Sequence, residues 1–328
     1  MMVNKENPFL APLLDRERLN KQGSSKETYH VSLDIRGSGM VYSPGDCVAV
    51  LPENDPELVL LIEEALGTSQ FHDFLLKKAN LSRVTGRFLD KVCHRSFAHE
   101  RDKIEYLQGK DLLDIIQDNQ LDFSSFLEHL SPLLPRFYSI AGYHPDSIDL
   151  LIRTFSYVYA GKERPGVASD FVCRRHVTHL PIYLHPTKHF KLPENPETPI
   201  IMIGPGTGVA PFRSFLAARA SLPGKNWLFF GERSSSTDFY YESFFKSHPN
   251  LKLECAFSRD QAEKVYVQHK MLEQKEELKS WIQEGAIVYI CGDAHLMAKD
   301  VQNTLKIILE VDDLKALRKN KQLLLDVY

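Results

Sequence analysis

From residue 200 onward the chain alternates short apolar runs with stretches that have the spacing of helices. The apolar runs occupy residues 200–204, 226–232, 251–257, 287–292 and 323–328. Each run has the length of one strand, and each intervening segment is long enough for the crossover that neighbouring parallel strands require. The rhythm therefore predicts a doubly wound parallel sheet with helices on both faces.

A glycine-rich turn, GPGTGVAPFR, begins at Gly204 at the end of the first of these runs and leads into helix-like sequence. Glycine lets the backbone bend sharply and approach a ligand closely. The start of the following helix offers unpaired N–H groups to an anion such as a diphosphate. No Gly-Lys-Ser/Thr follows the turn, which disfavours an ATP-type P-loop. By itself the turn is also compatible with a purely structural role.

Two groups of residues point to different dinucleotides. Glu232, at the end of the second run, is near the position of the acid that binds the adenosine ribose in NAD-binding folds, about 20 residues after the glycines. The segment FSRDQAEKVYVQ instead offers Ser258, Arg259 and Lys264 as donors and Tyr266 as a stacking face. Such a group suits a dianionic 2′-phosphate, although a solvated charged loop has the same composition. The residues alone leave this choice open.

The sequence before residue 196 has a different rhythm. Apolar and polar residues alternate around Val31, Ile148 and Leu180, with turn-forming segments such as RGSG and YSPGD between the strands. This pattern predicts antiparallel strands with one solvent-facing side, in a sheet or small barrel. Residues 55–131 differ, because their apolar residues recur at three- and four-residue spacing and so predict a helical insert.

We therefore predict an α/β plus β fold with two domains. The first is an antiparallel β-barrel domain over residues 1–195, with the helical insert at about 55–131. The second is a doubly wound α/β domain over residues 196–328. The Pro-rich, polar segment KLPENPETP at 191–199 is the predicted linker.

The composition excludes several classes of protein. The 40 basic and 43 acidic residues give a net charge of −3, without the basic excess typical of nucleic-acid-binding proteins. The five cysteines are scattered and form no C-x-x-C pair, which argues against a disulfide framework and favours a reducing compartment. The sequence has neither a signal-peptide apolar core nor an apolar span of about 20 residues, so we expect a cytoplasmic protein without a membrane partner.

Two groups of residues are close in sequence but lack the spacing of a metal site. One contains His176, His179, His185 and His189, and the other contains Cys93, His94 and His99. No metal site is predicted.

Six motifs occur in the chain in one order. They are RFYSIAG (136–142), GVAS (166–169), GPGTGVAPFR (204–213), FSRDQAEKVYVQ (257–268), VYICGDAHLMAKDV (288–301) and DVY (326–328). Together they resemble the FAD/NADPH half of the diflavin reductases, and PGKNWLFFG and NPETPIIMIGPGTG are especially similar to the sulfite reductase branch of that family. The resemblance extends from Asn7 to Tyr328. It implies a ferredoxin–NADP reductase-like fold with FAD and NADP(H) as cofactors.

By this resemblance, the first motif holds FAD. Arg136 would neutralise the diphosphate, Tyr138 would lie against the flavin ring, and Ser139 would lie beside the flavin's reactive nitrogen. Tyr157 matches the aromatic residue that packs on the FAD adenine, and Tyr159 is an alternative for that role. The second motif would offer N–H groups and a hydroxyl to the diphosphate, from Gly166, Val167, Ala168 and Ser169.

The remaining motifs are implied to bind NADPH. Its diphosphate would be held by Gly204, Gly206, Thr207 and Gly208, with Arg233 nearby. The 2′-phosphate and adenosine would be read by Ser258, Arg259, Lys264, Tyr266 and Gln268. The nicotinamide end would lie near Cys291, Gly292, Asp293 and Met297. The resemblance therefore favours NADP over NAD.

The implied reaction is hydride transfer from NADPH to FAD, which can release the electrons singly. The family surrounds the reacting rings with a serine, a cysteine, an aspartate and a terminal aromatic, which correspond to Ser139, Cys291, Asp326 and Tyr328. Ser139 and Asp326 would balance charge as hydride leaves, and Cys291 would be a small, soft neighbour of the nicotinamide rather than a nucleophile. Tyr328, where many relatives have Trp, would cover the flavin until the nicotinamide displaces it.

Diflavin reductases normally carry an FMN-binding domain before this half, whereas this sequence begins at the FAD module. We therefore expect an NADPH-dependent flavoprotein reductase in electron transport, whose electrons leave to a separate acceptor protein. The sulfite reductase haemoprotein is the acceptor that the resemblance implies. A separate FMN protein, a flavodoxin or a ferredoxin-like carrier is the alternative. A nucleotide-binding subunit without turnover is a third hypothesis, against which the four retained residues argue.

Overall fold

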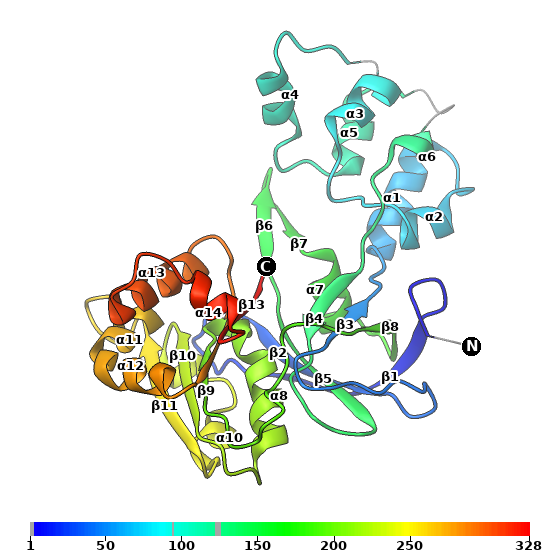
Figure 1. Ribbon diagram of the computed structural model, residues 1–328. Coiled ribbons are helices and arrows are strands. Elements are labelled where there is room, and N and C mark those ends of the chain that lie inside the picture. Colours follow the sequence, from blue (N-terminus) through cyan, green and yellow to red (C-terminus); the bar gives the residue numbers. More distant parts are fainter. Residues whose placement is uncertain (1–2, 94, 122–125) are drawn as a thin grey trace. The chain divides into compact units, whose positions relative to one another are not determined.

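The computed structural model of the protein describes residues 3–93, 95–121 and 126–328 (Figure 1). The chain divides into two compact units. Unit 1 consists of Met1–Ala49, Phe137–Arg153 and Ile182–Tyr328, and unit 2 consists of Val50–Arg136 and Thr154–Pro181. Unit 1 holds nearly all of the two large sheets, and unit 2 holds the helical insert.

The first large sheet is antiparallel and has the strand order β4-β3-β8-β1-β2-β5. Its strands are β1 (Phe9–Arg18), β2 (Thr28–Asp34), β3 (Cys47–Val50), β4 (Arg136–Ser139), β5 (Ser147–Arg153) and β8 (His179–His185). β2 pairs antiparallel with both β1 and β5. Val31 and Leu33 of β2 are fully buried, as the alternation of apolar residues predicts.

The prediction of one solvent-facing side is wrong for β5. All five residues from Ile148 to Ile152 are buried, so both faces of the strand are covered. Leu151 packs in one apolar cluster with Phe212 of helix α8 (Ala210–Arg219). The second face of β5 is thus covered by a segment that follows much later in the chain, which local alternation does not reveal.

The second large sheet has the order β11-β10-β9-β12-β13, and every neighbouring pair is parallel. Its strands are β9 (Ile200–Ile203), β10 (Asn226–Glu232), β11 (Leu251–Phe257), β12 (Ile287–Gly292) and β13 (Leu323–Val327). The helices between them are α8, α9 (Ser235–Asp238), α10 (Glu242–Ser247), α11 (Val267–Glu273), α12 (Lys275–Gln283), α13 (Met297–Leu309) and α14 (Lys315–Lys319). All five apolar runs are strands, which confirms the predicted fold class.

Helices cover both faces of this parallel sheet (Figure 1). Ile201 and Val288 pack with Met271 of α11 on one face. Their neighbours Ile200 and Tyr289 pack on the other face, in the cluster that contains residues of α8. Because successive side chains of a strand point to opposite faces, continuous apolar runs are what a doubly covered sheet requires.

Unit 2 contains a group of helices and one hairpin. The helices are α1 (Pro56–Leu66), α2 (His72–Lys77), α3 (Gly86–Phe88), the π-helix η1 (Leu89–Cys93), α4 (Glu100–Leu107), α5 (Leu112–Asp118), α6 (Phe126–His129) and α7 (Val167–Cys173), and the hairpin is β6 (Ser156–Tyr159) with β7 (Lys162–Pro165). Helices α1 to α6 lie within the predicted insert, of which residues 94 and 122–125 are outside the described part. Asp55 caps α1 through the N–H of Glu57, and a capping box of Asp111 and Asp114 begins α5.

A buried carboxylate connects the two sheets of unit 1. Asp149 Oδ2 on β5 accepts a hydrogen bond of 2.9 Å from Arg213 Nη1 on α8. Its Oδ1 accepts one of 2.9 Å from Ser32 Oγ. Two histidines face the same carboxylate, with Nε2 of His30 at 3.7 Å and Nε2 of His144 at 3.6 Å. Arg213 also donates to the Ala141 carbonyl at 2.7 Å, so α8 is fixed against the antiparallel sheet.

We expect Asp149→Asn to lower the free energy of unfolding by about 3 kcal/mol at neutral pH, because the Arg213 guanidinium would lose the charge that compensates its burial. Burial acts to raise the Asp149 pKa, but His30 and Arg213 outweigh it, and the pKa lies below its ordinary value. A carboxylate of this kind stabilises the fold above its unfolded-state pKa and loses that contribution as the pH falls through the folded-state value.

The difference in stability between the wild type and Asp149→Asn should therefore shrink below about pH 4. Urea unfolding of both proteins between about pH 7 and about pH 3 checks this. A difference that stays constant over the whole range would contradict it.

Candidate active site

The predicted diphosphate turn connects β9 to α8 through a 3₁₀ turn, Gly206–Val209. Gly206 has a φ of +61°, a conformation that residues with a Cβ adopt only with strain. A Cβ on Gly208 would lie 2.2 Å from the carbonyl oxygen of Cys291. The turn therefore passes directly against β12, and this close approach requires glycine.

Two of the predicted catalytic residues, Ser139 and Cys291, converge on one carboxylate oxygen of a third, Asp326. β12 and β13 are neighbours in the parallel sheet, and their register places Cys291 opposite Asp326. Asp326 Oδ2 accepts a hydrogen bond of 3.0 Å from Ser139 Oγ and lies 3.8 Å from Cys291 Sγ. Ser139 comes from the end of β4 in the other sheet. Residues from both sheets of unit 1 thus meet at one point.

The Cys291 thiol is neutral in this arrangement. Burial, and secondarily the adjacent Asp326 carboxylate, raises its pKa well above the ordinary value. A protonated thiol can donate a hydrogen bond to the carboxylate, whereas nucleophilic catalysis would need the thiolate. The geometry agrees with the predicted role of Cys291 as a neutral neighbour of the reacting ring.

Sequence reasoning missed Cys47. It begins β3, the neighbour of β4, and its Sγ lies 3.8 Å from Ser139 Oγ. Burial, followed by the charge of Asp326, raises the pKa of Cys47 to about 11. The residue is part of no motif, so only the pairing of β3 with β4 reveals its position.

Tyr328 follows β13 and lies against the glycine turn. Its hydroxyl is 3.1 Å from Thr207 Oγ1, and its backbone N–H donates to the Gly292 carbonyl at 3.1 Å. The residue is nevertheless 65% exposed. A ring that is held through its hydroxyl and is open to solvent can move aside at small cost.

The predicted residues at the start of α13 have a local structural role. Asp293 Oδ1 accepts hydrogen bonds from the N–H groups of Leu296 at 2.7 Å and Met297 at 3.2 Å, which fixes the turn that leads into α13. A Cβ on Gly292 would lie 2.9 Å from Met297 Cε. Their contact with the nicotinamide stays a prediction.

The predicted 2′-phosphate residues follow β11. The N–H of Ser258 donates to the Glu232 carbonyl at 2.9 Å, and the N–H of Arg259 donates to the Arg233 carbonyl at 2.8 Å. The two charged side chains of this group, Arg259 and Lys264, are exposed, and so is Tyr266. Gln268 Nε2 donates to Asp300 Oδ2 at 3.5 Å.

Glu232 is buried and already has partners. The ammonium of Lys26 lies 2.6 Å from each of its carboxylate oxygens. Tyr240 donates its hydroxyl to Oε1 at 3.0 Å, and the N–H of Arg233 donates to Oε2 at 2.7 Å. Sequence reasoning missed Lys26 and Tyr240, because neither is in a motif. The carboxylate that could have accepted a ribose hydroxyl of NAD is thus bound by the protein itself.

In unit 2, the GVAS motif forms the start of α7. Gly166 is the N-cap, and its carbonyl accepts hydrogen bonds from the N–H of Asp170 at 2.9 Å and from Ser169 Oγ at 3.0 Å. A Cβ on Gly166 would lie 2.2 Å from the Phe155 ring. The glycine is therefore required by local packing as well as by the predicted ligand. Of the other predicted FAD residues, Arg136 belongs to unit 2, and Tyr138 and Ser139 belong to unit 1.

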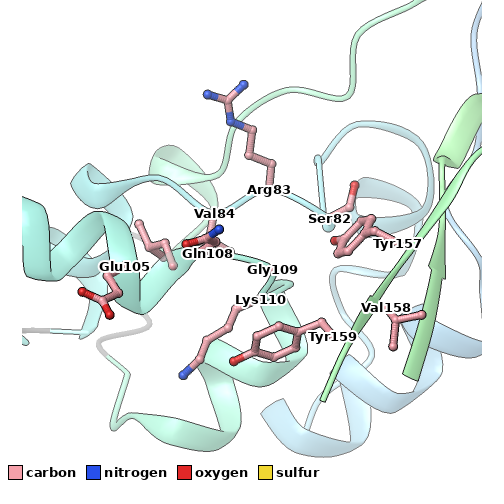
Figure 2. A pocket seen from close by; sticks show the side chains of 11 residues that line it. Ser82, Arg83, Val84, Glu105, Gln108, Gly109, Lys110, Tyr157, Val158 and Tyr159 are labelled. Carbon is pink, nitrogen blue, oxygen red and sulfur yellow. The ribbon is translucent and has the colours of Figure 1, made fainter. Parts of the chain in front are cut away.

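Unit 2 also contains a pocket of about 620 Å³ (Figure 2). Both tyrosines considered for the adenine, Tyr157 and Tyr159, line it, together with Arg83 and Lys110. Tyr159 is packed more closely, because a Cβ on Gly109 would lie 2.4 Å from its ring. The pocket brings the two aromatic candidates together with cationic side chains.

Comparison with known proteins agrees with this geometry. Residues 1–89 match the family described as FAD binding domain, and residues 202–303 match the family described as oxidoreductase NAD-binding domain. The chain is 42% identical to the sulfite reductase [NADPH] flavoprotein alpha-component of Bacillus subtilis, over 94% of this chain and 57% of that protein. Proteins of the same name from Vibrio parahaemolyticus and Photobacterium profundum are 36% and 34% identical, each over 99% of this chain. These matches confirm the predicted resemblance to the FAD/NADPH half of the diflavin reductases.

The two family matches confirm FAD and NADP(H) as the predicted classes of cofactor, because one family binds FAD and the other binds a nicotinamide dinucleotide. The chain spans 57–61% of the length of these three relatives.

The described residues contain neither a candidate membrane-spanning helix nor a candidate metal site. Within residues 3–93, 95–121 and 126–328, no helix is long and apolar enough to cross a membrane. In the same ranges, no three His, Cys, Asp or Glu side chains are grouped so that they could hold a metal ion. His94 lies outside the described residues.

Proposed function

We propose that this chain transfers hydride from NADPH to bound FAD and passes the electrons to a separate acceptor protein. The observation that carries the proposal is the convergence of Ser139 and Cys291 on Asp326 Oδ2. Within this cluster, Cys291 belongs to β12, and the glycine turn contacts β12 at the carbonyl of the same residue. A diphosphate seat and a group suited to balance charge are therefore adjacent within unit 1.

The residues present fit the two cofactors. The glycine turn packs directly against β12 at Gly208 and leads into α8, and N–H groups at the start of a helix suit a diphosphate. Tyr138 and Ser139 on β4 are the proposed contacts of the flavin ring, and Arg136 is proposed for the FAD diphosphate. FAD, when bound, accepts hydride and can release the electrons singly.

At the cluster of Ser139, Cys291 and Asp326, the protein is proposed to contribute electrostatic stabilisation and a fixed geometry. The nicotinamide becomes positively charged as it loses hydride, and a fixed carboxylate stabilises that charge more as it develops. Hydrogen bonds from Ser139 and Cys291 hold Asp326 Oδ2 in place, so little reorganisation is needed during the reaction. Cys291 is buried, which keeps water from this side of the cluster.

In unit 2, we assign Gly166, Val167, Ala168 and Ser169 to the FAD diphosphate. Either Tyr157 or Tyr159 is the proposed partner of the adenine, since both line the pocket in Figure 2. The FAD-binding and NADP-binding domains are proposed to divide at residues 195 and 196, in the segment that connects β8 to β9. The helical insert at about 55–131 is assigned to the first of them.

The 2′-phosphate is the proposed reason for NADPH use. Arg259 and Lys264 offer exposed positive charge beside Ser258 and Tyr266, and charge-assisted bonds to a phosphate dianion are strong. Asp293 and Met297 are assigned to the nicotinamide end. The ion pair of Glu232 with Lys26 also supports NADPH over NADH, because the carboxylate is held by Lys26 and is not open to a ribose hydroxyl.

For the acceptor, the names of the relatives favour a sulfite reductase haemoprotein, with a flavodoxin or ferredoxin-like carrier as the alternative. A cytoplasmic location is proposed with it. All five cysteines are free thiols, which supports a reducing compartment.

The proposal is tested with purified protein reconstituted with FAD. The protein should be yellow, and its flavin absorbance should bleach when NADPH is added anaerobically. Absence of bleaching despite bound FAD would overturn the proposed hydride transfer and favour a subunit without turnover. Adding candidate acceptors to the reduced protein then identifies the partner by NADPH-dependent reduction.

We expect Tyr328→Ala to lower the preference for NADPH over NADH by roughly tenfold or more. The Tyr328 hydroxyl contacts Thr207 of the glycine turn, and its ring is proposed to cover the flavin, where it competes with the nicotinamide for the same place. Only a coenzyme with strong additional contacts displaces the ring easily. Steady-state kcat/KM for the two coenzymes measures the ratio. Tyr328→Phe, which keeps the ring and loses the Thr207 contact, is the matched control and should retain most of the preference. An unchanged ratio in Tyr328→Ala contradicts this role.

A further inference from the structure

The carboxylate of Glu232 lies beside the anion-binding turn. Glu232 is the last residue of β10 and is 8% exposed. A Cβ on Gly206 would lie 3.5 Å from its Oε1, and its carbonyl accepts the N–H of Ser258 at the start of the proposed phosphate loop. A free negative charge at this position would repel both the diphosphate and the 2′-phosphate of NADPH.

Lys26 removes that charge from the site. Its ammonium contacts both oxygens of Glu232 at 2.6 Å, and both side chains are buried, with 11% and 2% of their surfaces exposed. Tyr240 and the N–H of Arg233 take further lone pairs of the carboxylate. Lys26 comes from the segment between β1 and β2, so the antiparallel sheet supplies the neutralising group for the nucleotide-binding sheet.

The surrounding contacts hold Lys26 and Glu232 in this arrangement. Thr28 Oγ1 lies 3.0 Å from the Tyr240 hydroxyl, and the N–H of Thr28 donates to Asn20 Oδ1 at 2.5 Å. Asn20 donates in turn to the buried Asp238 at 2.7 Å. The segment that carries Lys26 is therefore fastened at several points, on both sides of the residue, which holds its backbone beside Glu232.

We propose that Lys26 determines coenzyme preference by binding Glu232, so that the carboxylate neither accepts the 2′-hydroxyl of NADH nor repels the 2′-phosphate of NADPH. The inference rests on the proposed use of NADPH and names a residue outside the motifs that bind it. Lys26 is a positioning residue in this scheme, because it acts on the coenzyme through Glu232.

The experiment compares binding of NADP⁺ and NAD⁺ to the full chain loaded with FAD, by isothermal titration calorimetry, in a double-mutant cycle. Lys26→Met keeps the length of the side chain and removes its charge. We expect the ratio of NADP⁺ to NAD⁺ affinity to fall by at least about tenfold, the effect of placing like charges at one site. The double variant Lys26→Met with Glu232→Gln should recover most of the wild-type ratio, because the unpaired carboxylate is gone.

Two results of the double-mutant cycle would each overturn the inference. One is a wild-type ratio in Lys26→Met, and the other is a double variant that stays as weak toward NADP⁺ as the single one, since Lys26 would then contact the phosphate directly. If Lys26→Met does not fold, Glu232→Gln alone decides the question: its ratio should equal or exceed that of the wild type, and a lower ratio counts against the inference. Lys26→Arg should preserve the ratio.

Lys21→Met is the matched control, because Lys21 is an exposed lysine of the same segment with a 3.9 Å contact to Glu242. It should bind both coenzymes as the wild type does, and a ratio that falls with Lys26→Met and Lys21→Met alike would overturn the inference. Failure of the proposed function looks different. In that case the wild-type protein would show no preference for NADP⁺ at the outset, or no FAD reduction.

Discussion

Asp326→Asn is expected to slow the reduction of bound FAD by NADPH roughly 10²–10³-fold. The asparagine keeps the size of the side chain and its hydrogen bond from Ser139, but it no longer carries the negative charge that stabilises the developing nicotinamide cation. FAD content and the affinity for NADPH should change little, because the nicotinamide ring of NADPH carries no charge before the hydride leaves. Anaerobic stopped-flow measurement of flavin bleaching gives the rate directly.

The control for Asp326→Asn is Asp312→Asn, which removes a carboxylate from an exposed position. It should bleach at the wild-type rate. A loss of less than about threefold in Asp326→Asn, with FAD fully bound, would show that the carboxylate does not take part in hydride transfer. A loss accompanied by absent FAD would instead mean a structural role.

Gly208→Ala is expected to weaken NADP⁺ binding by more than about tenfold and to lower the free energy of unfolding by roughly 1–3 kcal/mol. The added Cβ would lie 2.2 Å from the Cys291 carbonyl oxygen and 2.8 Å from its carbonyl carbon. Both atoms belong to the backbone of β12, which is a central strand of the sheet, so the turn must move instead. Calorimetric titration with NADP⁺ and thermal unfolding measure the two effects.

Gly285→Ala is the control for Gly208→Ala, because it introduces backbone strain without a steric clash. Gly285 has a φ of +98°, and nothing lies within 4 Å of an added Cβ. This variant should lose a similar amount of stability through strain but bind NADP⁺ normally. If Gly208→Ala binds NADP⁺ within about twofold of the wild type, the turn is not the diphosphate seat.

The parallel sheet could be predicted from the sequence because its inner strands β9, β10 and β12 are buried on both faces. Such strands are continuous apolar runs, and the runs that end at Glu232 and Gly292 keep their limits in the structure. The position of the glycine turn followed from the same rhythm. The individual strands of the antiparallel sheet were predictable from alternation, but the covering of β5 was not, since it depends on α8.

The candidate site was predictable only where its residues belong to motifs. Ser139, Cys291 and Asp326 were expected together, and the structure brings them to one carboxylate oxygen. Cys47 and Lys26 could not be found in this way, because each meets its partner through tertiary contacts between distant segments. Glu232 shows the same limit: its sequence position suggests a ribose contact, and only its buried partners reveal that the carboxylate is already bound.

The fastening of α8 to the antiparallel sheet has a practical consequence for engineering. Ala141 and Leu151 share one apolar cluster with Phe212 and Tyr289, and Arg213 reaches across to Asp149. A nucleotide-binding half transplanted from a relative would meet a foreign surface at each of these contacts. Chimeras that change coenzyme use should therefore exchange matched pairs of residues across this interface rather than cut the chain at the linker.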